Sequence, residues 1–422
     1  MKYSRVKGTR DILPHESYKW LYIEDKIREF ALLNNFSYIK TPAFEVTELF
    51  VRGIGNETDI VSKEMYTFLD KSKTSITLKP EMTAPVIRAY IQNNLEQISA
   101  VIRVYYIDAL FRQEKPQKGR LRQFHQYGFE IIGTPYPEAD AEIIVLSYAI
   151  LKSLGLDDLS VKINSIGDRQ TRKAYLELLR ENIAPYKNDL CPTCQTRFSR
   201  NVLRIFDCKN QKCQELLDEH APRIIDHISD EDKEHFSLVL KLLDIAGVSY
   251  QIDHKLVRGL DYYTRTTFEI TSPLLGSQDA LCGGGRYDYL VEDLGGKPTP
   301  AVGVAGGIER LLIALEEAGK IPVTDSNLVY IVSIGEKARE YGFKLSWELR
   351  DQNIPCEFDT LRRSPKAQMR DAGRKKAKYV VIVGEDELKR NKIILRDMSE
   401  SYQEEIELNF LIPTLKQKMS SV

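Results

Sequence analysis

The sequence predicts an α+β domain, built on an antiparallel sheet with flanking helices, followed by a C-terminal α/β domain. Residues 101–133 contain two long strand patterns separated by a polar loop, as in an antiparallel hairpin. Residues 168 to about 250 are mostly helical and charged, and they interrupt strand-rich sequence. Beyond residue 326, apolar strand runs alternate with helical patterns, which is typical of a sheet covered on both faces.

We therefore expect a first domain at 1–325, with an inserted helical subdomain at about 168–250, and a second domain at 326–422. A length of 422 residues agrees with two or three domains. With 42% hydrophobic and 29% charged residues, the composition is that of a soluble protein with a sizeable core. The net charge of −1 excludes a strong overall field, so any nucleic-acid contact must come from local basic patches.

The chain carries no sign of membrane insertion or secretion. No apolar run follows Met1, and the longest apolar stretches, such as residues 328–334, are too short to span a bilayer. Four of the six cysteines cluster within 191–213 and two are isolated, which does not resemble a disulfide framework. We therefore expect a cytoplasmic protein with no membrane partner.

Each predicted element rests on a local pattern. In the first domain, apolar residues recur at helical spacing or alternate as in strands. Helices are expected at 16–35, 85–93, 139–154 and from 308 to about 319, and strands at 101–112, 122–133 and 266–270. In the second domain the same patterns predict strands at 328–334, 356–358 and 379–383, with helices at 338–349 and 365–377.

The second hairpin strand has an unusually polar face. Strand period two places Phe124, Gln126, Gly128 and Glu130 on one side, where a buried face would be apolar. Arg112, at the end of the preceding strand, shares that face. The pattern leaves two interpretations open, a binding surface or the solvated face of an amphipathic sheet.

Arginines bracket the hairpin loop. Arg112, Arg120 and Arg122 offer guanidinium groups of the kind that bind phosphate. A solvated hairpin tip would have the same composition, so this alternative also stays open.

Glycine-rich segments follow later in the chain. Residues 255–265 combine Arg258 with paired tyrosines, and residues 283–288 combine three glycines with Arg286 and Tyr287. Glycine there could allow close approach of a ligand, or each segment could be a flexible turn. Neither has the spacing of a phosphate-binding P-loop or a Rossmann context, so dinucleotide binding is rejected. Residues 303–310 are expected to open a helix, where Arg310 could reach an anion or form a salt bridge.

In combination, these segments resemble the motifs of class II aminoacyl-tRNA synthetases in their histidine-specific form. The resemblance extends from about residue 5 to residue 400, with Asn35 standing where the family has glycine before motif 1. The matching segments are 7–11 for the N-terminal signature, 36–45 for motif 1, 110–128 for motif 2, 303–310 for motif 3, and 256–263 and 284–288 for the histidine signatures.

The resemblance implies a ligase that joins L-histidine to ATP, with Mg²⁺ bridging the outer phosphates, and then passes histidine to its tRNA. It implies no protein ligand for a catalytic metal. Arg112 and Arg258 would be the catalytic residues. The implied histidine-binding residues are Glu81, Thr83, Gln126, Glu130, Tyr262, Tyr263 and Tyr287, and the implied ATP-binding residues are Arg112, Arg120, Phe124 and Arg310.

Motif 1 implies a homodimer, and the second domain resembles the family's anticodon-binding domain. Its basic stretch suits RNA phosphates but could also be a solvated lysine-rich face. The cations concerned are Arg362, Arg363, Lys366, Arg370, Arg374, Lys375, Lys376 and Lys378.

Alternative functions are a non-catalytic regulatory paralogue of ATP phosphoribosyltransferase and a generic ATP-dependent ligase. The regulatory paralogue usually lacks the anticodon-binding domain, whereas residues 328–422 look complete here. Glu130 with the paired tyrosines 262 and 263 argues for histidine over another small molecule.

The cysteine cluster is the last pattern that could carry chemistry. Cys191 and Cys194 are separated by two residues, and Cys208 and Cys213 by four, with thirteen residues between the pairs. Four thiolates at such spacing could hold structural zinc. Because the resembling family does not require zinc, we expect free thiols in a small subdomain instead.

Overall fold

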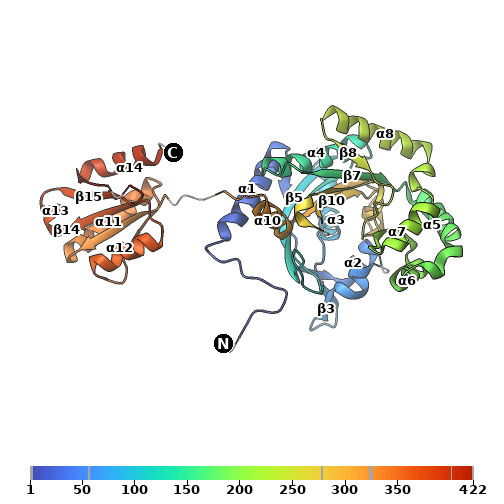
Figure 1. Ribbon diagram of the computed structural model, residues 1–422, viewed down its shortest axis with the longest axis horizontal. Helices are drawn as coiled ribbons and strands as arrows, with labels where there is room; N and C mark the ends of the chain where they lie inside the picture. Colours follow the sequence, from blue (N-terminus) through green and yellow to red (C-terminus); the bar gives the residue numbers. More distant parts are fainter. Residues whose placement is uncertain (1–2, 56–57, 277–278, 323–326, 401, 421–422) are drawn as a thin grey trace. The chain divides into compact units, whose positions relative to one another are not determined.

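The computed structural model describes residues 3–55, 58–276, 279–322, 327–400 and 402–420. The chain divides into two compact units, Met1–Ile321 and Pro322–Val422 (Figure 1). The predicted boundary between residues 325 and 326 lies outside the described residues. Within the described ranges, no helix is both long and apolar enough to cross a bilayer.

The first unit is organised around an eight-stranded sheet in the order β1-β5-β6-β11-β10-β9-β7-β8. All neighbours between β5 and β7 in this order are antiparallel, whereas the edge strands β1 and β8 run parallel to theirs. The strands are β1 (Ser37–Tyr38), β5 (Ile102–Phe111), β6 (Gln123–Ile132), β7 (Ser160–Ser165), β8 (Tyr250–Ile252), β9 (Thr264–Thr271), β10 (Ala280–Arg286) and β11 (Ala301–Gly307). The predicted α+β class with an antiparallel sheet is confirmed.

One hydrophobic core joins helices to a single face of this sheet. Phe129 on β6 and Phe268 on β9 are completely buried there, together with Ile27, Ile143 and Leu311 from the helices. Burial of such side chains is the main force that holds a helix on a sheet. The covering helices are α1 (Ser17–Leu33), α4 (Pro137–Ser153), α8 (Asp230–Ile245) and α10 (Ile308–Glu317).

Because strand residues alternate, the other face of β6 points away from this core. It carries Phe124, Gln126, Gly128 and Glu130, as predicted, and faces α3 (Thr83–Gln92). A small sheet in the order β2-β4-β3 and helix α2 precede α3 in sequence, and none of these was predicted. Their bounds are β2 (Phe44–Val46), α2 (Thr47–Ile54), β3 (Tyr66–Leu69) and β4 (Ser75–Leu78).

The turn that ends α1 explains one departure from the family pattern. Asn35 has a φ of 58°, in the left-handed region that favours glycine. Asparagine is among the few other residues that enter this region readily. The Phe36 amide then donates to the Ala31 carbonyl at 2.8 Å, which directs the chain from α1 into β1. Asparagine can therefore occupy this position, where the resemblance places glycine.

Two glycine-rich stretches lie in strands, whereas residues 256–263 lie outside any helix or strand. Gly283, Gly284 and Gly285 lie in β10 and do not form a turn. Gly303 to Gly307 belong to β11, so the segment is not the opening of a helix; α10 begins only at Ile308. Strand propensity is low for glycine, so its presence in two central strands calls for a local reason.

The segment for which the sequence predicts an inserted helical subdomain, at about residues 168–250, lies between β7 and β8. It contains α5 (Arg169–Ile183), α6 (Pro192–Arg200), the 3-10 turn η4 (Val202–Asp207), α7 (Gln211–His220) and α8 (Figure 1). Buried Tyr175, Leu179, Ile205 and Leu217 share a hydrophobic cluster with residues of α3 and β5. Helices α5 and α7 and the turn η4 therefore pack with α3 and β5, whereas α8 contributes Phe236, Val239 and Leu243 to the main core.

The second unit has a five-stranded sheet in the order β13-β12-β14-β15-β16. Strands β12 (Val329–Ile334), β13 (Cys356–Phe358) and β14 (Tyr379–Gly384) are parallel. Strand β15 (Lys392–Asp397) pairs antiparallel with β14, and β16 (Gln403–Glu407) pairs antiparallel with β15. The helices are α11 (Glu336–Asp351), α12 (Pro365–Arg374), α13 (Glu385–Lys389) and α14 (Leu411–Ser420). The predicted α/β class of this unit is confirmed.

A buried ion pair ties the end of β10 to α4. Arg286 and Asp140 are both fully buried, and Arg286 Nε donates to Asp140 Oδ2 at 3.0 Å. Arg286 also donates to the carbonyls of Thr134 and Tyr136 at 2.9 and 3.0 Å. Although burial alone would raise it, the charges of Arg286 and His235 hold the pKa of Asp140 at about 2.

Removing Asp140 should therefore destabilise the first unit strongly. Asp140→Ala leaves the buried Arg286 guanidinium with Asp288 as its remaining carboxylate partner, and breaking a buried ion pair of this kind costs about 3–5 kcal/mol. Urea unfolding monitored on the full chain checks this. The matched control is Glu138→Ala, an exposed carboxylate on the same helix, which should change the free energy of unfolding by less than about 0.5 kcal/mol. Equal effects of the two variants would contradict the assignment.

Candidate active site

A cavity of about 390 Å³ opens over the polar face of β5 and β6 in the first unit. Eleven of the twelve predicted site residues line it, and the twelfth, Glu130, is 1% exposed and hydrogen bonds to two of them. The eleven are Glu81, Thr83, Arg112, Arg120, Phe124, Gln126, Arg258, Tyr262, Tyr263, Tyr287 and Arg310. Segments that are distant in the sequence therefore converge on one cavity.

Glu130 lies at the closed end of the cavity. Its Oε2 accepts a hydrogen bond from the Tyr287 hydroxyl at 2.6 Å, and its Oε1 accepts one from the Thr83 hydroxyl at 3.0 Å. Burial raises the pKa of Glu130 to about 8, even though these hydrogen bonds act to lower it. A ligand that donates a hydrogen bond here would favour the ionised carboxylate.

Tyrosine rings form the wall beside Glu130. The Tyr262 ring centre lies 4.7 Å from that of Tyr263 and 5.6 Å from that of Tyr287. Tyr106 on β5 also lines the cavity, although the sequence did not single it out. The available signal was its register, because Tyr106 lies opposite Gly128 on the same face. This end of the cavity thus offers aromatic surface with hydroxyl groups.

Glu81 sits at the start of α3. Its two carboxylate oxygens accept hydrogen bonds from the backbone N–H groups of Thr83 and Ala84, at 2.7 and 2.9 Å. Burial raises its pKa, while these N–H groups act to lower it. The positive end of a helix dipole favours a carboxylate in this place. Glu81 therefore presents a fixed acceptor beside Glu130 and Thr83.

Arginines line the other end of the cavity. Arg112 Nε donates to the Pro80 carbonyl at 2.8 Å, and its guanidinium carbon lies 5.2 Å from the Phe124 ring centre. Arg310 Nη1 donates to the Ala280 carbonyl at 3.0 Å. Burial lowers the pKa of both arginines, yet a guanidinium remains charged at neutral pH. Backbone carbonyls thus orient two fixed positive charges toward the same space.

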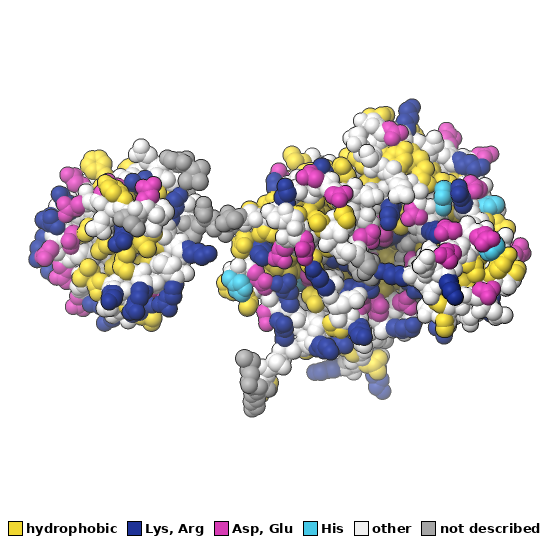
Figure 2. Space-filling view, in the orientation of Figure 1, with side chains coloured by type: hydrophobic (Ala, Val, Ile, Leu, Met, Phe, Trp, Pro, Cys, Tyr) yellow, Lys and Arg dark blue, Asp and Glu magenta, His cyan; other side chains and the backbone are white. Residues whose placement is uncertain are grey.

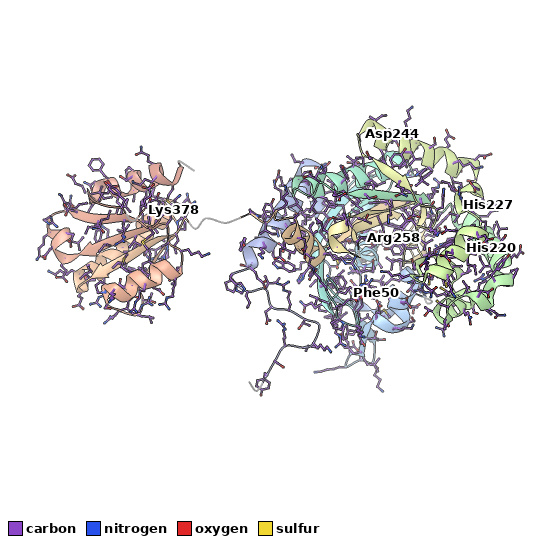
Figure 3. All side chains as sticks on the ribbon, in the orientation of Figure 1. Phe50, His220, His227, Asp244, Arg258 and Lys378 are labelled. Atoms are coloured by element: carbon purple, nitrogen blue, oxygen red, sulfur yellow. The ribbon has the colours of Figure 1, made fainter. Side chains whose placement is uncertain are left out.

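Arg258 reaches this space from the segment before β9 (Figure 3). It forms an ion pair with Glu269 on β9, and its guanidinium carbon lies 6.0 Å from the Tyr263 ring centre. Burial lowers its pKa, but the charge of Glu269 outweighs this and raises it above the ordinary arginine value. Glu269 was not predicted from the sequence. Arg258 therefore stands where the tyrosine and arginine ends of the cavity meet.

The hairpin loop closes one side with a mixture of charges. Arg120 Nη1 donates to Glu114 Oε2 at 3.2 Å, and Arg112 Nη1 lies 3.8 Å from Glu114 Oε1. Glu114 lines the cavity but was not predicted. Arg122, which the sequence grouped with these arginines, instead donates to the carbonyls of Lys7 and Glu114 and does not line the cavity.

The glycines in β10 and β11 make room for the charged groups. Gly303 pairs with Glu130, and a Cβ at Gly303 would lie 1.6 Å from Glu130 Oε2. A Cβ at Gly283 would lie 2.5 Å from Arg258 Nη1. This is the local reason for glycine in these strands, and it replaces the flexible-turn interpretation.

The sequence matches two family models over most of its length. The model described as Histidyl-tRNA synthetase matches residues 8–311, and the one described as Anticodon binding domain matches residues 328–418. A "Histidine--tRNA ligase" of Halothermothrix orenii is 47% identical, over 97% of this chain and 98% of the relative. One of Thermotoga sp. (strain RQ2) is 45% identical over 100% of both chains.

Solved structures agree with the sequence relatives. A structure titled as apo S. aureus histidyl-tRNA synthetase has a TM-score of 0.82 and 39% identity, covering 98% of this chain and 100% of the other. A structure titled as an ATP phosphoribosyltransferase regulatory subunit/histidyl-tRNA synthetase from Bacillus halodurans C has a TM-score of 0.66. That second structure is 22% identical, covers 91% of this chain and 99% of the other, and shares the fold alone.

Substituting Gly303 tests the close approach of Glu130. Gly303→Ala forces the carboxylate or the strand to move, and overpacking of this kind costs about 1–3 kcal/mol. The control is Gly307→Ala in the same strand, where the nearest heavy atom outside its neighbours would be 3.8 Å from the new Cβ. Thermal unfolding should show a clearly lower melting temperature for Gly303→Ala only. A Gly303→Ala protein as stable as the wild type would show that Glu130 lies elsewhere.

Proposed function

The chain belongs to the histidyl-tRNA synthetase family, and we propose that the cavity of its first unit is the site where histidine is activated. As a histidine–tRNA ligase, the protein joins histidine to ATP with release of pyrophosphate and transfers histidine to the 3′ end of its tRNA. This assignment rests on one observation: groups suited to binding histidine and groups suited to binding phosphate line the same cavity. Glu81, Tyr262, Tyr263 and Tyr287 line this cavity beside buried Glu130, and Arg112, Arg258 and Arg310 line it as well.

A non-catalytic regulatory role is not favoured. The relatives named histidine–tRNA ligases cover nearly the whole chain at 45–47% identity. The match to the anticodon-binding family supplies the domain that the regulatory paralogue usually lacks. Arg112, Arg258 and Arg310 also line one cavity together, as catalysis by the arginines would require.

Histidine would bind at the closed end. Glu130 and Tyr263 would contact the imidazole ring, with Tyr262 and Tyr287 around it. An apolar amino acid would leave these buried polar groups without hydrogen-bond partners. The free-energy cost of unpaired polar groups lets a polar site reject apolar analogues. The α-amino group would be held by Glu81 with Thr83 and Gln126, because Glu81 presents a carboxylate at the edge of the same space.

ATP would occupy the arginine end. Phe124 would stack on adenine, and its ring already packs beneath the Arg112 guanidinium. Arg112 would contact the α-phosphate, Arg310 the γ-phosphate, and Arg120 the phosphate chain from the hairpin loop. Guanidinium groups suit this role because they stay charged and donate in a planar fork.

The reaction needs no general base for its first step. The histidine carboxylate is already ionised at neutral pH. One of its oxygens attacks the α-phosphorus, the bond from that phosphorus to the bridging oxygen breaks, and pyrophosphate leaves with the electron pair. Arg112 and Arg258 provide positive charge where negative charge develops on the phosphoryl oxygens, an effect that needs no reorganisation because both groups are already held in place.

The cavity also fits Mg²⁺ bound mainly through ATP. Glu114 and Glu269 line it and offer the carboxylate oxygens that Mg²⁺ prefers. Among the described residues, the only group of three or more His, Cys, Asp or Glu arranged to hold a metal is the cysteine cluster. Mg²⁺ here would therefore take most of its ligands from phosphate and water, and when bound it would neutralise charge on the outer phosphates.

The second unit would contact the tRNA. Cations of the predicted basic stretch gather on α12 and the turns around it, and dark blue side chains mark one edge of this unit in Figure 2. Arg363 and Lys375 are bound to acidic side chains, Asp371 and Glu357 among them. Lys366 and Arg370 are exposed and are therefore better placed for phosphate contacts.

A homodimer through the motif 1 region would cover exposed apolar side chains. Tyr38 on β1 and Phe44 on β2 are 53% and 52% exposed, and Leu32 at the end of α1 is 76% exposed. Exposed apolar side chains of this size can form part of a contact surface. This supports the homodimer that motif 1 implies.

ATP–pyrophosphate exchange with single amino acids tests the proposed activation step. Histidine should support exchange in the presence of Mg²⁺, and other amino acids should not. Arg258→Ala should lower kcat by about 10²–10³-fold, the usual loss when one donor to a developing oxyanion is removed. The control is Arg52→Ala, which removes an exposed arginine paired with Glu48 on α2. Absence of exchange with folded wild-type protein would refute the assignment, and a change in KM alone for Arg258→Ala would remove its transition-state role.

The pH dependence of kcat/KM for histidine tests the role of Glu130. Its pKa of about 8 in the free protein means that the carboxyl is largely protonated at neutral pH. Because the ionised carboxylate is the stronger acceptor for the imidazole N–H, kcat/KM for histidine should rise up to about pH 8 and then level off. Because the Glu130→Gln side chain cannot ionise, this variant should bind histidine more weakly and should not show the rise in kcat/KM up to about pH 8. Histidine's own ionisations are common to both proteins, so an unchanged limb in Glu130→Gln would contradict the assignment.

A further inference from the structure

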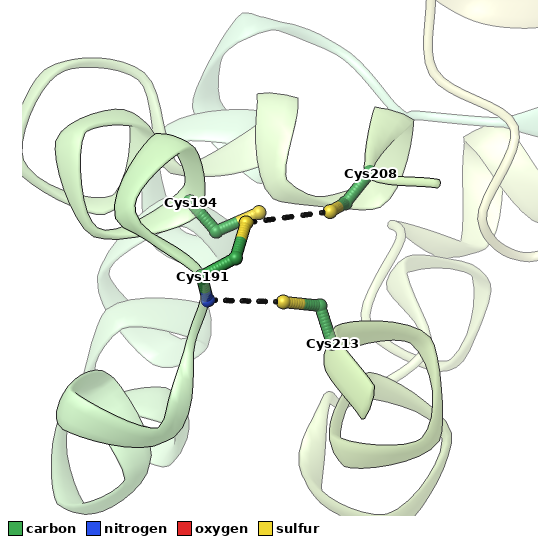
Figure 4. Close-up of side chains that lie close together, drawn as sticks. All are labelled: Cys191, Cys194, Cys208 and Cys213. Carbon is green, nitrogen blue, oxygen red and sulfur yellow. Dashed lines mark hydrogen bonds between the residues drawn. The ribbon is translucent and has the colours of Figure 1, made fainter. Parts of the chain in front are cut away.

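The cysteine cluster of the insertion forms a group that the proposed function does not use. Cys191, Cys194, Cys208 and Cys213 are free thiols, and their sulfur atoms all lie within 4.8 Å of one another. Figure 4 shows the four side chains converging from separate elements. Cys191 and Cys194 come from the start of α6, Cys208 follows η4, and Cys213 lies in the first turn of α7. We propose that these four thiolates bind one structural Zn²⁺ ion.

The spacing of the sulfur atoms fits a tetrahedral metal. Zn–S bonds of about 2.3 Å at tetrahedral angles place the sulfurs about 3.8 Å apart. Cys191 Sγ and Cys208 Sγ are 3.8 Å apart. A disulfide would require about 2.05 Å and would join only two of the four. Because all four sulfurs lie within 4.8 Å of one another, small side-chain adjustments would allow one ion to bind them together.

Backbone N–H groups donate to two of the four sulfur atoms. Cys213 Sγ accepts a hydrogen bond from the Cys191 N–H at 3.2 Å, and Cys208 Sγ accepts one from the Asn210 N–H at 3.4 Å. Such backbone donors orient metal-bound sulfur and tune its charge. The N-termini of α6 and α7 add the positive ends of two helix dipoles. All-thiolate tetrahedral sites are the sites that zinc occupies in structural modules.

The metal would fix a wall of the active-site cavity. The chain between Cys194 and Cys208 carries η4, whose Arg204 lines the cavity and pairs with Asp59 at 3.1 Å. Asn201 at the start of η4 donates to Asp261 Oδ1 at 3.2 Å, one residue before Tyr262. Holding Cys194 and Cys208 on one ion would therefore keep this segment against the cavity.

Metal analysis of the full chain tests the proposal independently of the synthetase reaction. Protein purified without chelators or a histidine tag should contain one zinc per chain by inductively coupled plasma mass spectrometry. Replacement by Co²⁺ should give the intense visible bands of tetrahedral thiolate coordination. Cys208→Ser should lose most of the zinc, whereas Cys208→His, which retains a ligand, should keep more of it. Cys356→Ser is the matched control, because Cys356 is a buried thiol of the second unit that donates to the Ser346 carbonyl.

Several results of these experiments would overturn the zinc proposal. Zinc-free, folded wild-type protein with four freely titrating thiols would overturn the proposal, as would iron in place of zinc or zinc that Cys208→Ser retains. Should Cys208→Ser fail to fold, the wild-type zinc content and the Co²⁺ spectrum still decide. Zinc removal should also speed proteolysis within the insertion and raise KM for histidine several-fold. A protein that binds zinc here but fails to exchange pyrophosphate would refute the proposed function and leave this proposal standing.

Discussion

The position of the Glu130 carboxyl within the sheet is the constraint on which the site depends. A carboxyl group at the sheet surface, flanked by strands on both sides, needs space and hydrogen-bond donors at once. Gly303 on the neighbouring strand provides the space, and the hydroxyls of Tyr287 and Thr83 provide the donors. Burial still leaves this group with a raised pKa, so part of its desolvation remains uncompensated until a ligand arrives. A polar ligand that donates a hydrogen bond to Glu130 can therefore compensate for the remaining desolvation of this carboxyl group.

The rest of the first unit keeps these groups in place. Tyr287 follows Arg286, whose buried ion pair with Asp140 joins the end of β10 to α4 in the core behind the sheet. His125, on the rear face of β6, packs edge-on against Trp20 with ring centres 5.0 Å apart. The polar face thus rests on a close-packed apolar one, so displacing a site residue requires moving the sheet. Because the sheet is rigid, the arginine charges stay in place and can stabilise a transition state without reorganising.

Much of this arrangement could be predicted from the sequence because it follows from periodicity. Period-two alternation placed Gln126 and Glu130 on one face, and helical spacing gave α1, α4 and α10. Glu269 and Tyr106 could not be found that way, because each matters only through a partner on another strand. Their roles depend on strand order and register, which are tertiary properties. The resemblance to a family supplied the assignments that no local pattern could.

The glycine-rich segments left two interpretations open in the sequence, a close approach of other groups or a flexible turn, and the reason is physical. Low strand propensity makes a run such as 283–285 look like a turn, whereas these glycines lie in a central strand where other groups need the missing side chain's volume. The cysteines show the complementary limit. Their spacing in the sequence allowed both a metal site and unrelated thiols. The choice between the two depends on whether separate elements bring the four sulfur atoms together, and in the structure these atoms lie within 4.8 Å of one another. Spacing in the sequence thus limits which side chains can come together. The packing of separate elements decides whether those side chains meet, as the cysteines do, and how much space is left between neighbouring strands, as at the glycines.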